Sequence, residues 1–569
     1  MFFAEPLLAQ SASDRQKNMA NFDFKKEHPN AFPVLTPKQI EAIAEFAECK
    51  TYKDGDVLFR AGATDFKFQV IQRGAIDIID RSSGEAVTIL THLAGEFTGD
   101  LSNLTGRVSN VDAIAKGETD VYEVCEAELH HIISESPGLS DLILQTFIAR
   151  ARALSNNEKF TGLRVIGSRF SADTFRIRDF LTKNHALYTY FDFAADAEIK
   201  MLLKSFRVSE ADLPVVGYGQ DWLLKNPSNE ELAEKIGIRR EIAKNTVFDL
   251  AIVGGGPAGL AAAVYGASEG LQTIVLEALA TGGQAGTSSK IENYLGFPTG
   301  LSGAELAGRA TLQAEKFGAA LSIPSEVEKL RFADGHSILK LTNGEEIKCK
   351  ALIIASGAEY RKLDVPNREK FDGAGVYYAA TQMESQLCGG DATVVVGGGN
   401  SAGQACIYLS ETARKVFLLI RGDDIGKNMS DYLVQRILAT PNIELLTETE
   451  ITRMDGGDHL ESVEMTNRQT NQTRTERVAG VFSFIGAIPR TAWLPEEIET
   501  DAKGFVKTGT RVADSKLWAN ERPPFYLETS RAGVFAAGDV RCDSVKRVAS
   551  SVGEGSMTVA FVHEYLKEL

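Results

Sequence analysis

Apolar and polar positions divide the chain into segments of different periodicity. Residues 31–155 begin and end with apolar residues at helical spacing, in TPKQIEAIAEFAECK and ELHHIISESPGLSDLILQTFIARARAL, with short alternating runs between them. Alternation with period two, broken by Gly, Asp and Ser, is typical of short strands joined by turns. The pattern predicts a small β-roll with flanking helices over 31–155, after an irregular polar lead-in over 1–30.

The next segment, residues 160–240, alternates between strand-like and helix-like runs. LRVIG, YTYFDF and LPVVGYG read as strands, and SADTFRIRDFLTKN, DAEIKMLLKSF and SNEELAEKIG read as helices. The polar run SNNEK is expected to link this module to the one before it. A strand–helix alternation of this kind predicts a small α/β module.

Residues 246–569 repeat a unit of apolar strand, glycine-rich turn and helix, which predicts a doubly wound α/β enzyme. The most apolar window, LAIVGGGPAGLAAAVYGA, is long enough to span a bilayer but is broken by Gly-Gly-Gly-Pro, so a buried strand and helix explain it better. The N-terminus has few basic residues before its apolar part, which argues against a secretory signal. We therefore expect a soluble cytoplasmic protein with no membrane partner.

Composition limits the kinds of molecule that the protein is expected to bind. A chain of 569 residues is too long to fold around a single hydrophobic core. Its 77 acidic and 61 basic residues give a net charge of −16. That charge is repelled by nucleic acid and by anionic membranes. The six cysteines form no C-x-x-C pair and do not cluster with histidine, so no metal site is expected and the thiols read as reduced.

Two glycine turns carry the candidate chemistry. The first, Gly254-x-Gly256-x-x-Gly259, lies between an apolar strand and an alanine-rich helix, and the next strand ends at Glu277. Gly254 suits the tight turn, Gly256 the approach of the backbone to a pyrophosphate, and Gly259 the packing of helix on strand. Glu277 is placed to accept hydrogen bonds from ribose hydroxyls. The predicted site also includes Pro257 and Ala258 at the start of the helix.

A remote segment points to the same site. GVFAAGDV runs from a strand into Gly538-Asp539, and the helix that follows directs its N-terminus at the same place. Two remote segments that converge on one nucleotide indicate FAD, which is long enough to need both.

The second turn, Gly397-x-Gly399-x-x-Ala402, again follows a strand and opens a helix, which predicts a second dinucleotide site with Asn400 and Ser401. The next strand leads to Arg421 instead of an acid. A cation there suits a 2′-phosphate, with Lys427 as a second candidate, so NADPH is favoured and NADH is the alternative. A solvated surface charge explains Lys427 equally well.

These motifs occur in the order found in bacterial thioredoxin reductases, which residues 246–569 resemble. The matching runs are IVGGGPAGLAAAVYGA, GGQAGTSSKIENYLGFP, LIIASGAEYRKL, VVVGGGNSAGQACIYL, FSFIGAIPRTAWL and GVFAAGDV. The resemblance implies an FAD-binding domain over 246–362 and 491–569, an inserted NAD(P)H-binding domain over 363–490, and a homodimer. It also implies that Gly283, Gln284 and Asn293 line the FAD site.

The family's redox cysteine pair is missing from this chain. Aligned from Gly375-Val376, its positions fall on Ala379 and Gln382, and neither side chain can form a thiolate. Cys388 lies six residues past Gln382, and Cys542 follows Gly538-Asp539, so both remain as lone thiols. The usual disulfide relay is therefore not expected.

A second pair is missing from residues 160–240, which resemble a glutaredoxin-like thioredoxin fold through LRVIGSRFSADTFRIRDFL and ADLPVV. Pro214 matches the cis-proline of that fold, while the cysteine positions fall on Ser171 and Thr174. Ser171 is expected to cap the helix through its hydroxyl.

Residues 31–155 resemble cyclic-nucleotide-binding domains of the catabolite-activator type through GEFTGDLSNLTGRVSNVDAIA. The resemblance implies an effector site at Gly99, Asp100, Leu101 and Arg107, although the loop is shorter and aspartate replaces the usual glutamate. A vestigial docking module is the alternative.

Three functional hypotheses remain. The first is an FAD-dependent NAD(P)H oxidoreductase that passes electrons to an unknown acceptor, with N-terminal modules that sense or dock. The second is a non-enzymatic flavin or nucleotide sensor. The third is disulfide reduction through Cys388 or Cys542. Two glycine turns favour the enzyme over a scaffold.

Overall fold

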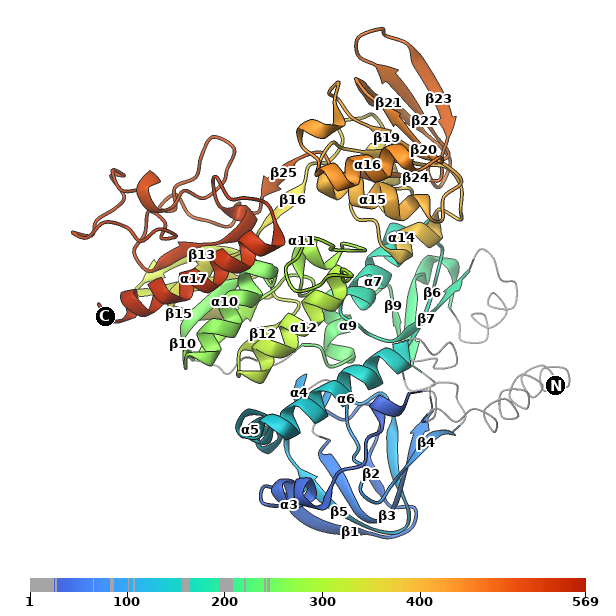
Figure 1. Cartoon of the computed structure of the whole chain (residues 1–569), viewed down its shortest axis with the longest axis vertical. Coiled ribbons are helices and arrows are strands. Elements are labelled where there is room, and N and C mark those ends of the chain that lie inside the picture. Colours follow the sequence, from blue (N-terminus) through green and yellow to red (C-terminus); the bar gives the residue numbers. More distant parts are fainter. Residues whose placement is uncertain are drawn as a thin grey trace, which may run out of the picture.

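The computed structural model describes residues 25, 28–64, 66–81, 86–100, 102–105, 108–155, 163–193, 208–218, 222–239, 242 and 246–569. Four parts follow one another through the molecule, as Figure 1 shows. We call them the N-terminal module (28–155), the middle module (163–239), the large lobe (246–362 and 491–569) and the inserted lobe (363–490).

The N-terminal module is an antiparallel β-roll with helices on one side. Its sheet has the order β1-β5-β3-β4, with β2 paired to β5. Phe68, Phe97 and Phe147 form the centre of its core. Its elements are η1 Pro29–Ala31, α3 Pro37–Ala44, β1 Glu48–Tyr52, β2 Val57–Phe59, β3 Phe68–Asp80, β4 Val87–Leu93, α4 Ser102–Thr105, β5 Asp112–Val124, α5 Glu126–Glu135 and α6 Pro137–Ser155.

One boundary predicted for this module is wrong. The helical pattern of TPKQIEAIAEFAECK ends in the structure at Ala44, and the last residues of that run begin strand β1. Because β1 pairs with β5 from Glu48 to Tyr52, the sheet takes residues that the apolar spacing had assigned to the helix.

The middle module is a mixed sheet of order β7-β6-β8-β9 with helices beside it. Strands β6 and β7 are parallel, and β8 and β9 are antiparallel to their neighbours. The elements are β6 Leu163–Gly167, α7 Ala172–Lys183, β7 Tyr188–Asp192, η2 Glu210–Asp212, β8 Val215–Tyr218, β9 Trp222–Lys225 and α9 Asn229–Lys235. The helix predicted in DAEIKMLLKSF and most of the linker SNNEK lie outside the described residues.

The large lobe is built on a mainly parallel sheet of order β12-β11-β10-β15-β14-β13, with β26 beside β15. Helices α10 and α17 lie together on this sheet (Figure 1). The elements are β10 Val247–Val253, α10 Pro257–Ser268, β11 Thr273–Leu276, α11 Gly283–Gly286, α12 Gly303–Lys316, β12 Ala320–Ser322, β13 Val327–Ala333, β14 His336–Leu341, β15 Glu346–Ile354, η4 Gly509–Arg511, β26 Val534–Ala536, η5 Gly538–Val540 and α17 Val548–Leu566.

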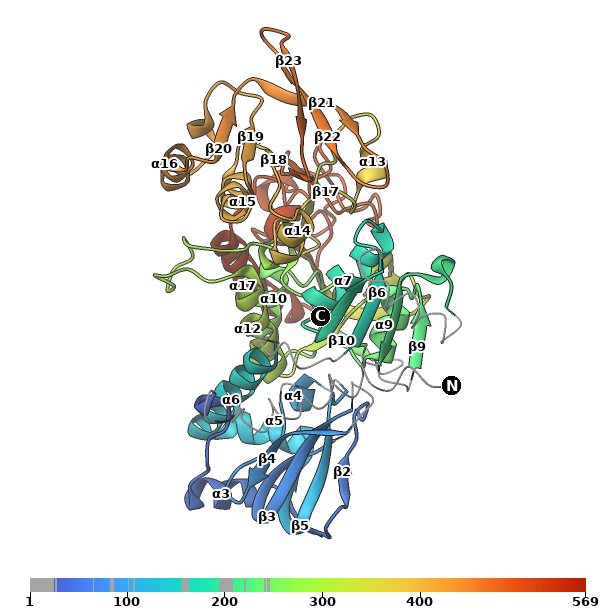
Figure 2. The ribbon, with the colours of Figure 1, turned by 90° about the vertical axis from the view of Figure 1, so that its right-hand side faces the viewer.

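The inserted lobe has a parallel sheet of order β17-β24-β18-β19-β20 and a separate antiparallel sheet, β21-β22-β23. Figure 2 shows it at the opposite end of the molecule from the N-terminal module. Its elements are α13 Arg368–Phe371, β17 Val376–Tyr377, α14 Gln382–Leu387, β18 Thr393–Val396, α15 Asn400–Ser410, β19 Val416–Leu419, η3 Ile425–Lys427, α16 Asp431–Ala439, β20 Ile443–Leu446, β21 Thr449–Asp455, β22 Ser462–Asn467, β23 Thr473–Arg477 and β24 Gly480–Ser483.

The two lobes are joined by a short antiparallel ribbon. Strands β16 (Ala358–Tyr360) and β25 (Ala487–Pro489) pair with each other and carry the chain out of the large lobe and back. We call this pair of crossings the hinge.

The middle module contacts both lobes. Asn184 donates from Nδ2 to the carbonyl of Leu279 in the large lobe at 3.0 Å, and Ile323 belongs to the module's apolar core. On the other side, the ring of Phe175 on α7 packs on that of Tyr377 in the inserted lobe, with centroids 5.6 Å apart. The module therefore bridges the lobes. Among the helices described, none is both long and apolar enough to cross a bilayer.

Candidate active site

The first glycine turn has the backbone geometry of a phosphate-binding loop. Gly254 has φ of 109°, and a Cβ there would lie 2.3 Å from the carbonyl oxygen of Ala355. A Cβ on Gly259 would lie 1.8 Å from the Gly254 carbonyl oxygen. A Cβ on Gly256, in contrast, would meet only the Cα of Gly283, at 3.8 Å. Two of the glycines are thus required by packing, and the third leaves open space at the N-terminus of α10.

The segment after β11 closes one side of this space. Gly283 has φ of 52°, and a Cβ there would lie 3.0 Å from the Cα of Gly256. The side-chain amide of Gln284 donates to the carbonyl of Ala358 in the hinge strand. The structure therefore brings Gly283 and Gln284 to the glycine turn, while Asn293 lies exposed further along the same segment.

Glu277 holds the turn in shape. Its carboxylate accepts hydrogen bonds from the backbone N–H of Gly255 at 2.7 Å and of Leu279 at 2.9 Å. Each oxygen keeps a lone pair, so the carboxylate can also accept from a ribose hydroxyl. That role stays a prediction.

The remote Gly538-Asp539 segment also reaches the turn. A Cβ on Gly538 would lie 2.9 Å from that of Ala258, and one on Gly555 of α17 would lie 2.1 Å from the Ala258 carbonyl oxygen. Burial raises the pKa of the Asp539 carboxyl, and its backbone carbonyl accepts a hydrogen bond from Lys546. A desolvated carboxyl beside a glycine turn suits recognition of hydroxyl groups.

One buried ion pair at this place was not expected from the sequence. Glu554 on α17 accepts from the backbone N–H of Gly538 at 2.7 Å and pairs with the guanidinium of Arg541. The pair fixes the Gly538 turn against the helix. In SVGEGSMTVAFVHEYL, Glu554 reads as an ordinary polar position of a helix, so the periodic pattern alone could not find it.

The second glycine turn repeats the first. Gly397 has φ of 147°, and a Cβ there would lie 2.7 Å from the carbonyl oxygen of Phe484, while a Cβ on Gly399 would meet nothing within 4 Å. Ala402 is buried where α15 packs on the sheet. The Asn400 side chain holds Ser430 through two hydrogen bonds of 2.7 and 3.0 Å, so it fastens the turn to the segment before α16.

The two cations predicted to recognise a 2′-phosphate differ in their surroundings. Arg421 follows β19, is exposed, and lies 3.6 Å from a carboxylate oxygen of Glu450. Lys427 donates to Asp423 at 2.5 Å within the same loop. Both side chains are more than half exposed, but Arg421 has the longer carboxylate contact, which leaves its guanidinium freer to pair with a phosphate.

Tyr360 on the hinge strand connects the two turns. Its ring packs edge-on against Phe484 with centroids 5.2 Å apart. Burial raises the pKa of its phenol, which is hydrogen bonded to Ser401 and lies near Asp539. This residue was not among those predicted, because its position depends on how the lobes meet and not on a local motif.

The positions of the missing thiols are filled by a helix start. Thr381 is the N-cap of α14 and its side chain accepts from the N–H of Met383, next to Gln382. Glu384 accepts from the backbone and hydroxyl of Thr381, and burial raises the pKa of its carboxyl. Thr381 and Glu384 therefore cap the start of α14 beside the positions predicted for the redox pair.

Neither lone thiol is set up to react. Cys388 ends α14, is 4% exposed, and burial raises its pKa to about 12. Burial also raises the pKa of Cys542, whose sulfur lies 3.5 Å from a carboxylate oxygen of Asp501. A thiol with a raised pKa forms little thiolate at neutral pH.

In the middle module the positions predicted for a cysteine pair hold Ser171 and Thr174. Ser171 caps α7 by accepting from the N–H of Thr174 at 3.3 Å, which confirms its predicted capping role. The Leu213–Pro214 peptide bond is cis. A Cβ on Gly167 would lie 2.3 Å from the Thr174 hydroxyl and 3.0 Å from Cβ of Pro214, so these side chains face each other across Gly167.

The candidate effector turn is held by an arginine that the sequence did not single out. Gly99 has φ of 101°, and Asp100 accepts from the N–H of Ser102 at 2.7 Å. The buried guanidinium of Arg150 on α6 donates to the carbonyls of Ala31, Phe97 and Gly99. Leu101 and Arg107 lie outside the described residues.

Comparisons with known proteins show which protein family the chain belongs to. A family model described as pyridine nucleotide-disulphide oxidoreductase matches residues 248–555, and one described as cyclic nucleotide-binding domain matches residues 49–136. The first match spans more than half of the chain. The chain therefore belongs to the pyridine nucleotide-disulphide oxidoreductase family.

Its relatives include thioredoxin reductases. Thioredoxin reductase of Bacillus subtilis is 31% identical over 331 residues, 58% of this chain and 98% of the relative. The 34.2 kDa protein in the rubredoxin operon of Clostridium pasteurianum is 32% identical over 319 residues, 56% of this chain and 97% of the relative. The crystal structure of T. acidophilum thioredoxin reductase aligns with a TM-score of 0.50 and 28% identity, over 56% of this chain and 98% of that one.

The comparisons confirm a thioredoxin reductase-like flavoprotein with a cyclic-nucleotide-binding-type domain. Family membership implies FAD and NADPH. The residues fit both, because the open positions at Gly256 and Gly399 are those at which a side chain would obstruct a pyrophosphate.

Proposed function

We propose that this chain is an FAD-dependent NAD(P)H oxidoreductase that passes electrons to an acceptor without a C-x-x-C pair. The observation that carries the proposal is the combination of two open glycine turns with Ala379 and Gln382 at the cysteine positions. Bound FAD supplies the hydride-accepting and electron-donating chemistry of this class.

Each group of residues has a role in this proposal. The backbone at Gly256 and Gly399 binds the two pyrophosphates, while Glu277 and Asp539 accept from hydroxyl groups. Arg421 pairs with a 2′-phosphate and so favours NADPH. The β16–β25 ribbon lets the inserted lobe turn against the large lobe, and Tyr360 contacts both.

The N-terminal parts are assigned to regulation or docking. The middle module is a glutaredoxin-like domain in which Ser171 and Thr174 have replaced the redox cysteines, supported by its strand order and its cis Pro214. The N-terminal module keeps the effector turn at Gly99 and Asp100, and a cyclic nucleotide is its candidate ligand. An electron relay through the middle module is chemically closed, because neither hydroxyl is oxidised as a thiol is.

Anaerobic mixing of the FAD-loaded protein with NADPH tests the enzyme. Rapid bleaching of the flavin, followed by reoxidation with an added quinone, is the expected result. Absence of bleaching would contradict the enzyme and support a non-enzymatic flavin or nucleotide sensor.

The thiols are tested by a Cys388→Ser, Cys542→Ser double variant, which should keep full NADPH–quinone turnover. A loss of turnover in a correctly folded variant would instead support disulfide reduction through Cys388 or Cys542. As a control, labelling with iodoacetamide should modify the exposed Cys49 before either buried thiol.

A further inference from the structure

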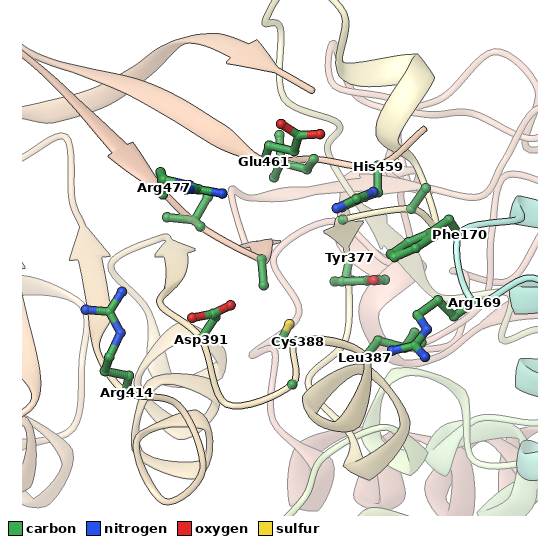
Figure 3. Close-up of a pocket in the computed structure, with 16 residues that line it drawn as sticks. Arg169, Phe170, Tyr377, Leu387, Cys388, Asp391, Arg414, His459, Glu461 and Arg477 are labelled. Carbon is green, nitrogen blue, oxygen red and sulfur yellow. The ribbon is translucent and has the colours of Figure 1, made fainter. Parts of the chain in front are cut away.

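A cavity of about 530 Å³ lies between the middle module and the inserted lobe, away from both glycine turns. Arg169 and Phe170 line it from the loop between β6 and α7, next to the capping residue Ser171. The inserted lobe contributes residues from five separate segments, some of which are labelled in Figure 3. Its volume falls in the range that encloses a ligand of drug-like size.

The cavity wall carries charges of both signs that the protein does not pair. Neither the guanidinium of Arg414 nor that of Arg477 makes a hydrogen bond or ion pair within the described part of the chain, and the same holds for the carboxylate of Asp391. Figure 3 shows Asp391 on the same side of the cavity as Arg414 and Arg477. The side chains of Arg414, Arg477 and Asp391 are exposed, so a ligand from solution can reach these charges.

The remaining charges at the cavity are partly occupied. Arg169 pairs with Asp192. Glu461 accepts one backbone N–H, from Gly457 at 3.4 Å, and keeps acceptor capacity. The free groups are thus two cations and two carboxylates.

This set of charges decides which ligand fits. A purely anionic ligand would be attracted by Arg414 and Arg477 but repelled by the two carboxylates, and a purely cationic ligand would meet the reverse. A molecule with both signs satisfies all four groups. Planar carboxylates suit guanidinium groups, and an ammonium group suits carboxylates.

Apolar contact comes from the other wall. The ring of Phe170 stacks on the imidazole of His459 there, and Tyr377 and Leu387 lie beside them (Figure 3). These surfaces offer contact to the methylene groups of a short chain.

We propose that this cavity binds a short acidic peptide with a free ammonium group, whose carboxylates pair with Arg414 and Arg477 and whose ammonium group pairs with Asp391 and Glu461. Because the cavity is shared, the bound peptide contacts the middle module and the inserted lobe together. The site is independent of the proposed electron transfer.

The test uses the full chain loaded with FAD and the dipeptide L-glutamyl-L-glutamate, followed by isothermal titration calorimetry at low salt. Saturable binding with one site per chain is expected. Arg414→Gln and Arg477→Gln should each weaken it about tenfold, since each removes a charge-assisted pair. The matched control is Arg453→Gln, an exposed arginine on β21 that pairs with Asp455 and does not line the cavity, and it should leave affinity unchanged.

The ammonium group is tested with the N-acetylated dipeptide, which keeps the carboxylates. The unmodified protein should prefer the free amine about tenfold, and Asp391→Asn should abolish that preference. No saturable binding, an equal effect of Arg453→Gln, or unchanged preference in Asp391→Asn would each overturn the proposal. Thermal midpoints of the variants show that folding is retained, and flavin bleaching by NADPH without dipeptide reports the proposed function separately.

Discussion

The ring of Phe170 stacks on the imidazole of His459, with centroids 4.0 Å apart and 12° between the planes. The two residues belong to different parts of the molecule, the loop before α7 and the loop before β22. Together with the Phe175–Tyr377 contact, the stack attaches the middle module to the inserted lobe.

A double-mutant cycle measures this attachment. Phe170→Ala and His459→Ala should each lower the free energy of unfolding of the inserted lobe, measured with urea. The loss in the double variant should be smaller than the sum of the two single losses by about 0.5–1.5 kcal/mol, the usual value of an aromatic pair. A Phe317→Ala variant, at an exposed ring on the large lobe, serves as the control and should not change the midpoint. Strict additivity at Phe170 and His459 would show that the contact contributes nothing.

Arg150 is predicted to be the main polar support of the N-terminal module. Burial lowers its pKa to about 10, so it remains charged at neutral pH, and it lies over the rings of Phe32 and Phe97. Arg150→Met should destabilise the module by about 3 kcal/mol, because three buried carbonyls lose their donor. Urea unfolding followed by hydrogen exchange of β3 and β5 measures the loss.

The control for Arg150 is Arg73→Gln, which removes exposed ion pairs with Glu118 and Asp120 and should leave the urea midpoint nearly unchanged. Equal losses in the two variants would contradict the supporting role. Flavin bleaching by NADPH should be unchanged in both.

The sequence predicted those features that depend on contacts between residues close together in the chain, and missed those that depend on contacts between distant residues. The glycine turns and the Ser171 cap depend on neighbours within a few residues, so spacing was enough to find them. The Phe170–His459 stack joins residues that no local pattern relates. Sheet β21–β23 was not predicted because strand β23 is exposed over most of its length and shows no apolar alternation.

Stability of the N-terminal module should fall as the pH is lowered from about 6.5 to about 4. Burial lowers the pKa of His92 to about 4, below the usual value of 6.5, so the unfolded chain binds a proton that the folded chain does not. The loss is at most about 3 kcal/mol over this window. Urea midpoints at pH 7 and pH 5 measure it.

A His92→Gln variant should flatten this pH dependence above pH 4.5. Below that, Glu96 adds a further loss, since hydrogen bonds from His92 and Lys25 outweigh burial and hold its pKa at about 2. The matched control is His336→Gln, a partly exposed histidine of the large lobe. An unchanged slope in His92→Gln would show that another group titrates.

The two helix-side glycines of the first turn should respond differently to alanine. Gly256→Ala places a methyl group in open space, 3.8 Å from its nearest neighbour, so the protein without cofactor should keep its thermal midpoint. FAD should nevertheless bind at least about tenfold more weakly, because the backbone can no longer approach the pyrophosphate.

Gly259→Ala places its Cβ 1.8 Å from the Gly254 carbonyl oxygen and should lower the thermal midpoint even without FAD. Gly138→Ala, where a Cβ meets nothing within 4 Å, is the control for both. Thermal denaturation of the cofactor-free protein and titration of flavin fluorescence separate the two effects. Unweakened FAD binding in Gly256→Ala would remove the turn from the cofactor site.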